Sequence, residues 1–165
     1  MLSITMSSAM WFFPLAGLIG VWAAISDLKR MKIPNRAVLA LVGVFVVVGL
    51  IALPFAEYPW RLLQLVVVLV IGFVLNMVGA VGAGDAKFAA AMAPFIALGD
   101  SMTFLTLFAA VMLAAFVIHR LFRRIPAIRR LTPEWESWEN NDFPMGLALG
   151  GSLVFYLGLG ILYGS

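Results

Sequence analysis

Two aspartates stand at the edges of long apolar runs, where an ionisable side chain is unusual. Asp27 follows 26 residues without a charged side chain, and Asp85 ends the motif Gly82-Ala83-Gly84-Asp85. Ionisable groups at membrane depth are costly and mark functional sites. Two close carboxyl groups do not both ionise readily, so one keeps its proton. The ionised group then deprotonates water while the protonated group polarises a peptide carbonyl, which is the chemistry of an aspartic protease.

The glycines of this motif have a physical role beside Asp85. Gly82 and Gly84 allow a tight backbone with φ > 0 and the close approach of an extended substrate strand. A helix is expected to begin at Asp85, and the N-terminus of a helix stabilises a negative charge. The alternative for the motif is an ordinary tight turn with Asp85 as the helix N-cap.

Asp27 also has a simpler alternative, an interfacial ion pair with Lys29 or Arg30. Other chemistries lack their residues, because the chain has no cysteine and one histidine, His119. This excludes disulfides, Cys-ligated zinc, iron–sulfur clusters and a thiol nucleophile. We interpret His119 as an interfacial residue at a helix end, and we predict no metal and no cofactor.

The elements that must position the two aspartates are membrane helices. The chain is 64% hydrophobic and 12% charged, whereas soluble domains have roughly 45–50% apolar and ~25% charged residues. A protein of 165 residues has too much surface to hide this excess, so its solvent is lipid. The net charge of +3 comes from basic residues between apolar runs. They are therefore topology signals, and no nucleic-acid partner is expected.

We predict an all-α, polytopic membrane protein with about six transmembrane helices and an extracytoplasmic N-terminus, as a single domain over residues 1–165. No basic residue precedes the first apolar run, so this run is a membrane helix and no cleavable signal peptide. The expected helices lie near 9–26, 37–54, 62–79, 85–99, 101–119 and 143–163.

The fourth segment is short for a membrane helix. Its uncharged run, 88–99, has twelve residues and reaches ~18 Å, well short of a ~30 Å hydrocarbon core. The distribution of Lys and Arg between the two sides of the membrane indicates that it crosses nevertheless. With six crossings, ten of the eleven cations lie on the cytoplasmic side and only Arg61 lies outside. Asp27 and Asp85 then lie at similar depth, near the cytoplasmic headgroups.

The remaining polar residues have other interpretations. The cytoplasmic loop 120–142 is basic and then acidic, with Trp135 and Trp138 among the acids, and we interpret it as an interfacial loop that contacts anionic lipid. Substrate docking is the alternative role of this loop. Gln64 and Asn76 are interpreted as hydrogen-bonding groups between helices.

At these residues the sequence resembles the type IV prepilin peptidase family, membrane aspartic proteases with a Gly-x-Gly-Asp motif. Three segments match in the right order, and one residue, Met145, stands where the family commonly has an aromatic residue. The segments are Asp27 followed by Ile33-Pro34-Asn35, then Gly82-Ala83-Gly84-Asp85 followed by Lys87, and finally Phe143-Pro144-Met145-Gly146-Leu147-Ala148.

The resemblance implies catalysis by Asp27 and Asp85, supported by Gly82, Gly84 and Lys87 and by the other two segments. The substrate would be a prepilin or pseudopilin with a basic cytoplasmic leader and a hydrophobic helix in the bilayer. Cleavage, typically after a glycine, would occur at the cytoplasmic face of the bacterial or archaeal inner membrane, and other pilus-assembly proteins are potential partners. Which aspartate is the base stays open, because a coupled pair titrates as a unit.

Two departures from the larger members favour the short branch that serves Flp-type (tight adherence) pili. The first cytoplasmic loop is only about ten residues long, and there are no paired cysteines. N-methyltransferase activity is therefore not expected. Two other function classes stay open: a small proton-coupled transporter or channel, suggested by the two acids and by Pro94, and a non-catalytic scaffold of a pilus or secretion assembly.

Overall fold

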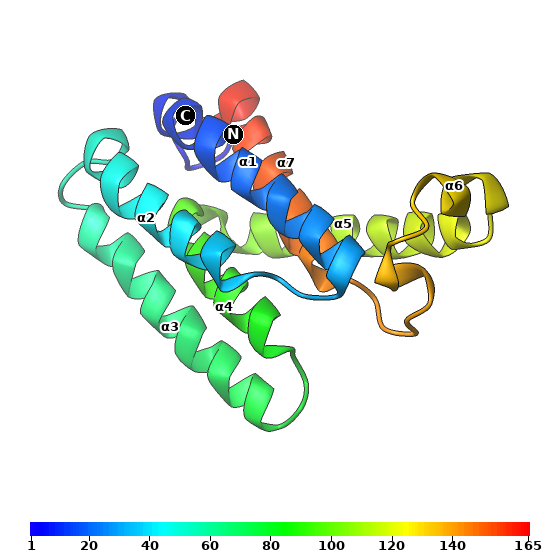
Figure 1. Ribbon diagram of the computed structural model, residues 1–165. Helices are drawn as coiled ribbons and strands as arrows, with labels where there is room; N and C mark the ends of the chain where they lie inside the picture. Colours follow the sequence, from blue (N-terminus) through cyan, green and yellow to red (C-terminus); the bar gives the residue numbers. More distant parts are fainter.

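Long apolar helices make up most of the structure, a computed structural model that describes residues 1–165 (Figure 1). Five helical segments are long and apolar enough to cross a membrane, which confirms the expected all-α, multi-pass membrane protein. The α-helices are α1 (Met6–Arg30), α2 (Asn35–Ala52), α3 (Tyr58–Met77), α4 (Ala83–Met92), α5 (Ser101–Arg123), α6 (Pro126–Leu131) and α7 (Met145–Tyr163). The 3-10 helices are η1 (Ala93–Phe95), η2 (Leu98–Asp100) and η3 (Glu136–Trp138).

Besides these five segments, α4, η1 and η2 together form one more crossing, the fourth along the chain. The α-helix expected over 85–99 ends at Met92, because Pro94 has no backbone N–H to continue the i→i−4 hydrogen bonds and its ring clashes with the carbonyl four residues earlier. Ten α-helical residues reach only ~15 Å, but the chain continues through two 3-10 turns and the extended residue Ile96 to Asp100. It thereby reaches the opposite end of the bundle.

Protein surrounds the non-helical part of this crossing. Irregular backbone is tolerated at membrane depth only where the protein buries it, and all residues from 91 to 97 are buried. Phe95 packs against Phe12 of α1 and Phe45 of α2, with ring centroids 4.9 and 5.4 Å apart. The backbone N–H of Ala97 donates to the hydroxyl oxygen of Tyr156 on α7, at 3.0 Å. Aromatic packing and a side-chain acceptor thus replace the lost helix.

The helices define two ends of the bundle, which we call the N-terminal end and the site end. At the N-terminal end, Leu2 pairs with Gly164, and the hydroxyl of Ser8 donates to the carbonyl of Ala52 at 2.6 Å. At the site end, the last turn of α1 contacts the first turn of α7. Since successive crossings alternate between these ends, the chain passes the bundle six times.

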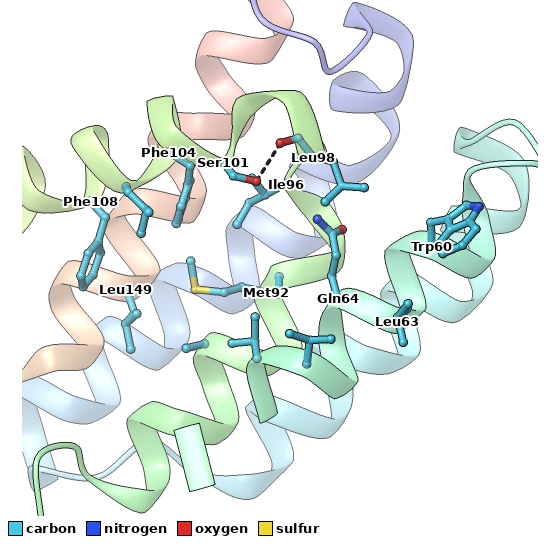
Figure 2. A pocket seen from close by; sticks show the side chains of 15 residues that line it. Trp60, Leu63, Gln64, Met92, Ile96, Leu98, Ser101, Phe104, Phe108 and Leu149 are labelled. Carbon is cyan, nitrogen blue, oxygen red and sulfur yellow. Dashed lines mark hydrogen bonds between the residues drawn. The ribbon is translucent and has the colours of Figure 1, made fainter. Parts of the chain in front are cut away.

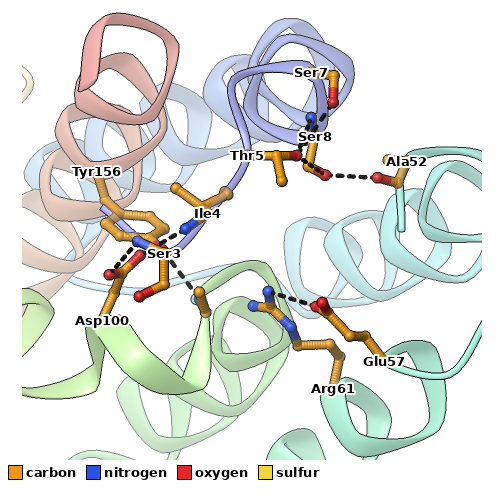
Figure 3. Close-up of polar contacts among 11 residues, drawn as sticks. Ser3, Ile4, Thr5, Ser7, Ser8, Ala52, Glu57, Arg61, Asp100 and Tyr156 are labelled. Atoms are coloured by element: carbon orange, nitrogen blue, oxygen red, sulfur yellow. Dashed lines mark hydrogen bonds and ion pairs between the residues drawn. The ribbon is translucent and has the colours of Figure 1, made fainter. Parts of the chain in front are cut away.

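Asp100 organises the N-terminal end (Figure 3). Its buried carboxylate accepts hydrogen bonds from the backbone N–H groups of Ser3, at 2.7 Å, and Ile4, at 3.0 Å. The hydroxyl of Tyr156 donates to the same carboxylate at 2.7 Å. Asp100 is therefore a structural anchor that fixes the start of the chain to α7 and η2.

The cations divide between the two ends as expected from the sequence. Arg61 is the only one at the N-terminal end, where its buried guanidinium lies 3.4 Å from the carboxylate of Glu57 (Figure 3). The other ten belong to elements at the site end: Lys29, Arg30, Lys32, Arg36, Lys87, Arg120, Arg123, Arg124, Arg129 and Arg130.

Two polar residues of α3 differ from their predicted role between helices. The side-chain amide of Asn76 donates to the carbonyl of Val81 at 2.8 Å, so it closes the linker from α3 to α4. The side-chain oxygen of Gln64 is buried and has no hydrogen-bond partner. The loop 120–142 also differs from a plain loop, because it contains the end of α5, α6 and η3.

Small residues bring α1 and α7, which lie side by side in Figure 1, into close contact. Gly20 and Gly150 face each other, and a Cβ atom at Gly20 would lie 3.0 Å from the carbonyl oxygen of Gly150. Such pairs of small residues allow helix backbones to approach closely in membranes. This contact sets the relative position of the two helices whose ends meet at Asp27.

We expect Gly150→Leu to destabilise the protein by about 1–3 kcal/mol, because the added side chain would push α7 away from α1. Gly43→Leu is the matched control, since a Cβ at Gly43 would meet nothing within 4 Å. Thermal unfolding in detergent measures both variants. Equal transition temperatures would contradict a tight contact at Gly150.

Candidate active site

Asp27 lies in the last turn of α1 and is 5% exposed. The helix ends at Arg30, where Met31 adopts a left-handed conformation with φ of 50° and donates its N–H to the carbonyl of Asp27. The Asp27 carboxylate accepts a hydrogen bond of 2.7 Å from the backbone N–H of Gly146. Lys29 pairs instead with Glu134, at 3.4 Å. An ion pair of Asp27 with Lys29 or Arg30 is therefore not the role of this carboxylate.

Gly146 lies in the first turn of α7, where backbone N–H groups have no acceptor within the helix. Pro144, the N-cap residue of α7, is buried and offers no side-chain cap, so the carboxylate of Asp27 serves that role from another helix. A Cβ atom at position 146 would lie 2.8 Å from the Cβ and 3.0 Å from an oxygen of Asp27. Only glycine leaves room for this contact.

Asp85 is the third residue of α4, and Gly82 is the N-cap. The interpretation of Asp85 as the N-cap is thus wrong by three residues. A Cβ atom at Gly82 would lie 2.6 Å from a carboxylate oxygen of Asp85. The chain's two ion pairs are Lys29–Glu134 and Arg61–Glu57, so Asp85 has no cationic partner.

The expected positive φ angles at Gly82 and Gly84 are wrong. Gly82 has φ of −64°, and Gly84 lies inside α4; the positive φ angles of the chain occur at Met31 and Gly79. The two glycines of the motif also differ from each other. Gly82 gives room to the Asp85 carboxylate, whereas a Cβ at Gly84 would make an ordinary contact of 3.8 Å with Ile33.

Asp27 and Asp85 line one cavity of about 1040 Å³ at the site end. It lies where the linker from α1 to α2, the linker from α3 to α4 and the segment before α7 meet. Pro34, Asn35 and Lys87 also line the cavity, so the three sequence segments come together in space. The full set of lining residues is Ser26, Asp27, Arg30, Met31, Lys32, Ile33, Pro34, Asn35, Gly79, Ala80, Val81, Gly82, Ala83, Gly84, Asp85, Lys87, Asn140, Asp142, Phe143 and Met145.

One wall of the cavity combines the expected segment at Phe143 with two residues that the sequence did not single out as site residues, Asn140 and Asp142. Asn140, Asp142, Phe143 and Met145 all precede or begin α7. Asp142, expected to stand apart in an acidic loop, is instead an exposed carboxylate on the cavity wall. The only sign in the sequence that Asp142 lies near the site is its position two residues before Pro144.

The end of α5 holds this wall in place. Arg120 donates to the carbonyl of Asn141 and Arg123 to that of Asn140, each at 2.9 Å. His119 stacks on Trp138, with ring centroids 5.0 Å apart. His119 is buried and both its ring nitrogens lack a partner, and it is absent from the cavity wall. It was expected as an interfacial residue at a helix end; it does lie near the end of α5, but it is buried.

The cavity offers carboxylates, three basic side chains (Arg30, Lys32 and Lys87) and backbone groups, and this set suits acid–base chemistry on a peptide. No group of three or more His, Asp or Glu side chains is placed to ligate a metal ion. The Asp27 carboxylate is held by a backbone N–H, the Asp85 carboxylate has no cationic partner, and a glycine lies beside each.

Comparison with known proteins identifies the family of the chain. The model of the type IV leader peptidase family matches residues 14–118, which include both Asp27 and Asp85 and end before the segment at Phe143. No curated protein and no solved structure matches the chain. Since the family match covers more than half of the chain, the protein belongs to the type IV leader peptidase family.

Proposed function

We propose that this peptidase is an aspartic endopeptidase that removes the leader peptide of prepilins, with Asp27 and Asp85 as the catalytic pair. One observation carries the proposal: two acids that are far apart in the chain line the same cavity, at the end of the helices that bring them there. The cavity also provides room for an extended peptide beside glycine backbone.

In the proposed mechanism the carboxyl pair shares one proton. The ionised carboxylate takes a proton from water, and the water oxygen attacks the carbonyl carbon of the scissile bond. The protonated carboxyl group donates its proton to the carbonyl oxygen, which gives a neutral tetrahedral diol. Proton transfer to the amide nitrogen and cleavage of the C–N bond then release the leader and restore the shared proton.

The proposed membrane face is the cytoplasmic one. Ten of eleven cations belong to the site end, and cytoplasmic segments carry such an excess of Lys and Arg. The leader would therefore be cut at the inner surface of the cytoplasmic membrane, while the hydrophobic helix of the substrate stays in the bilayer.

The proposed substrate class is the Flp-type prepilins, and the proposed chemistry is cleavage without methyl transfer. The linker between α1 and α2 consists of residues 31–34 only, and the chain has no cysteine. No cysteine-containing segment is thus inserted between the first two crossings.

We expect Asp27→Asn and Asp85→Asn each to lower the rate of prepilin cleavage by at least about 10³-fold, because the shared proton and the base are lost. Asp142→Asn is the comparison within the same cavity. Its carboxylate is exposed, so we expect at most a few-fold effect. Cleavage of a co-expressed Flp-type prepilin measures all three at matched protein levels, and full processing by either of the first two variants would end the proposal.

A second prediction concerns the glycines beside the acids. Gly82→Ala and Gly146→Ala place a Cβ atom within 3.0 Å of Asp85 and Asp27, respectively. We expect each to lower kcat about tenfold or more, equivalent to ~1.4 kcal/mol in the activation free energy. Gly84→Ala keeps ordinary contacts and should stay within about threefold. A larger loss of kcat in Gly84→Ala than in Gly82→Ala would show that Gly82 does not act by leaving space beside Asp85.

The membrane face is tested by cysteines introduced into this cysteine-free chain. Phe55 near the N-terminal end and Leu131 in the loop at the site end are 82% and 81% exposed. In intact cells, a membrane-impermeant maleimide should label Phe55→Cys, and it should label Leu131→Cys only after permeabilisation. The reverse pattern would put the acids on the outer face.

A further inference from the structure

An apolar groove runs along α4 between α3 and α5. α3 packs on α4 and η1, α5 packs on α7, and the structure has no extensive contact between α3 and α5. The two helices lie near each other where α5 begins and diverge toward the site end (Figure 1). An apolar cavity lies between these two helices, and residues of α4 and η1 line its floor.

This groove is a cavity of about 530 Å³ lined almost entirely by apolar side chains (Figure 2). Four residues line its floor: Ala89 and Met92 of α4, Ala93 of η1 and the extended residue Ile96. Two of them are alanines, and small residues let another helix approach closely in a membrane. The lining thus fits an apolar helix and offers no path for water or ions.

The groove continues the catalytic cavity along two helices. Asp85 lines the catalytic cavity and Ala89, four residues later, lines the groove; Met145 and Leu149 of α7 form a second such pair. Residues four apart lie on the same face of a helix. A bound chain therefore passes from one space to the other without crossing a helix.

Gln64 indicates that the groove is incomplete without an occupant. It extends from α3 toward η2 among the apolar side chains of the groove (Figure 2), and its buried side-chain oxygen has no hydrogen-bond partner. A buried acceptor without a partner costs ~1–3 kcal/mol. A donor on a bound helix removes this cost, whereas a lipid acyl chain offers none.

We propose that this groove is the docking site for the hydrophobic helix of the substrate, which enters sideways from the lipid between α3 and α5. This inference rests on the proposed function and adds the place where the uncleaved part of the substrate binds. The occupant is one transmembrane helix, because the groove is one space between α3 and α5 and because Gln64 needs a hydrogen-bond donor that a lipid acyl chain lacks.

The geometry joins the docked helix to the scissile bond. A helix on the floor formed by Ala89 and Met92 points its cytoplasmic end at Asp85, one turn away. The residues before it enter the catalytic cavity and extend past both aspartates. The position of the docked helix thus determines which peptide bond is cut, and the bond just outside that helix lies at the catalytic pair.

Cross-linking tests the docking site directly. Val67 and Leu69 of α3 are both exposed to the lipid region, but only Val67 lines the groove, and residues two apart face about 200° away from each other. In an Asp85→Asn background, each is replaced by cysteine. The probe is the Flp-type prepilin of the cleavage assay, with a single cysteine scanned along its hydrophobic helix.

We expect disulfide cross-links to the prepilin from Val67→Cys and at least about tenfold fewer from Leu69→Cys. Equal yields at both positions, or a preference for Leu69→Cys, would overturn the docking site. The result does not depend on catalysis, so it is separate from the test of the two aspartates.

Filling the groove gives the second measurement. Val67→Trp should raise KM for the full prepilin at least about fivefold with kcat nearly unchanged, because the bulky side chain competes with the docked helix before the reaction. Leu69→Trp, with the same bulk on the other face, should keep both constants. An unchanged KM in Val67→Trp would overturn the inference, while cleavage that survives Asp27→Asn or Asp85→Asn would instead overturn the proposed function.

Discussion

The hydrogen bond from the backbone N–H of Gly146 to the carboxylate of Asp27 is the contact on which the site depends. It joins residues 119 positions apart and links the end of α1 to the start of α7. Because the donor is a fixed backbone group at a helix N-terminus, it fixes the direction of the carboxylate. The bond requires glycine at position 146, and it requires the close approach of α1 and α7 that Gly20 and Gly150 permit.

The composite fourth crossing sets the other half of the site. A continuous helix would give α4 the same lipid-spanning character as its neighbours, but Pro94 ends the helical run near the middle of the bundle. The freed backbone must then be buried and hydrogen-bonded, which explains why Phe95 lies in the aromatic core and why Tyr156 accepts from Ala97. The short α4 leaves Asp85 at the start of a helix that begins in the cavity.

Much of this was accessible from the sequence, because the signals were strong and local. Apolar runs predicted the membrane helices, and the distribution of the eleven cations between the two sides of the membrane predicted that the fourth segment crosses. The segments at Asp27, Asp85 and Phe143 were expected to belong together, and the structure brings them to one cavity. Their catalytic roles stay predictions.

The sequence failed where the outcome depends on contacts between distant residues. No local pattern distinguishes the buried anchor Asp100 from an exposed loop acid, because its donors come from the start of the chain and from α7. The same holds for Asp142, which neighbours the cavity only because α5 holds the loop. The conformation of Gly82 was also missed, because a glycine needed for space has the same sequence as one needed for positive φ.

The two aspartates are held in different ways, and this difference bears on how a membrane peptidase opens to its substrate. Asp27 is buried and bound to the backbone of α7, so it moves only with the α1–α7 pair. Asp85 has no cationic partner and lies in the first turn of the helix that lines the floor of the groove. Under the proposed docking, a substrate helix along α4 would reach the carboxylate without a partner before the buried Asp27. The α1–α7 pair would then hold one acid of the proposed pair, and the side of the bundle between α3 and α5 would admit the substrate.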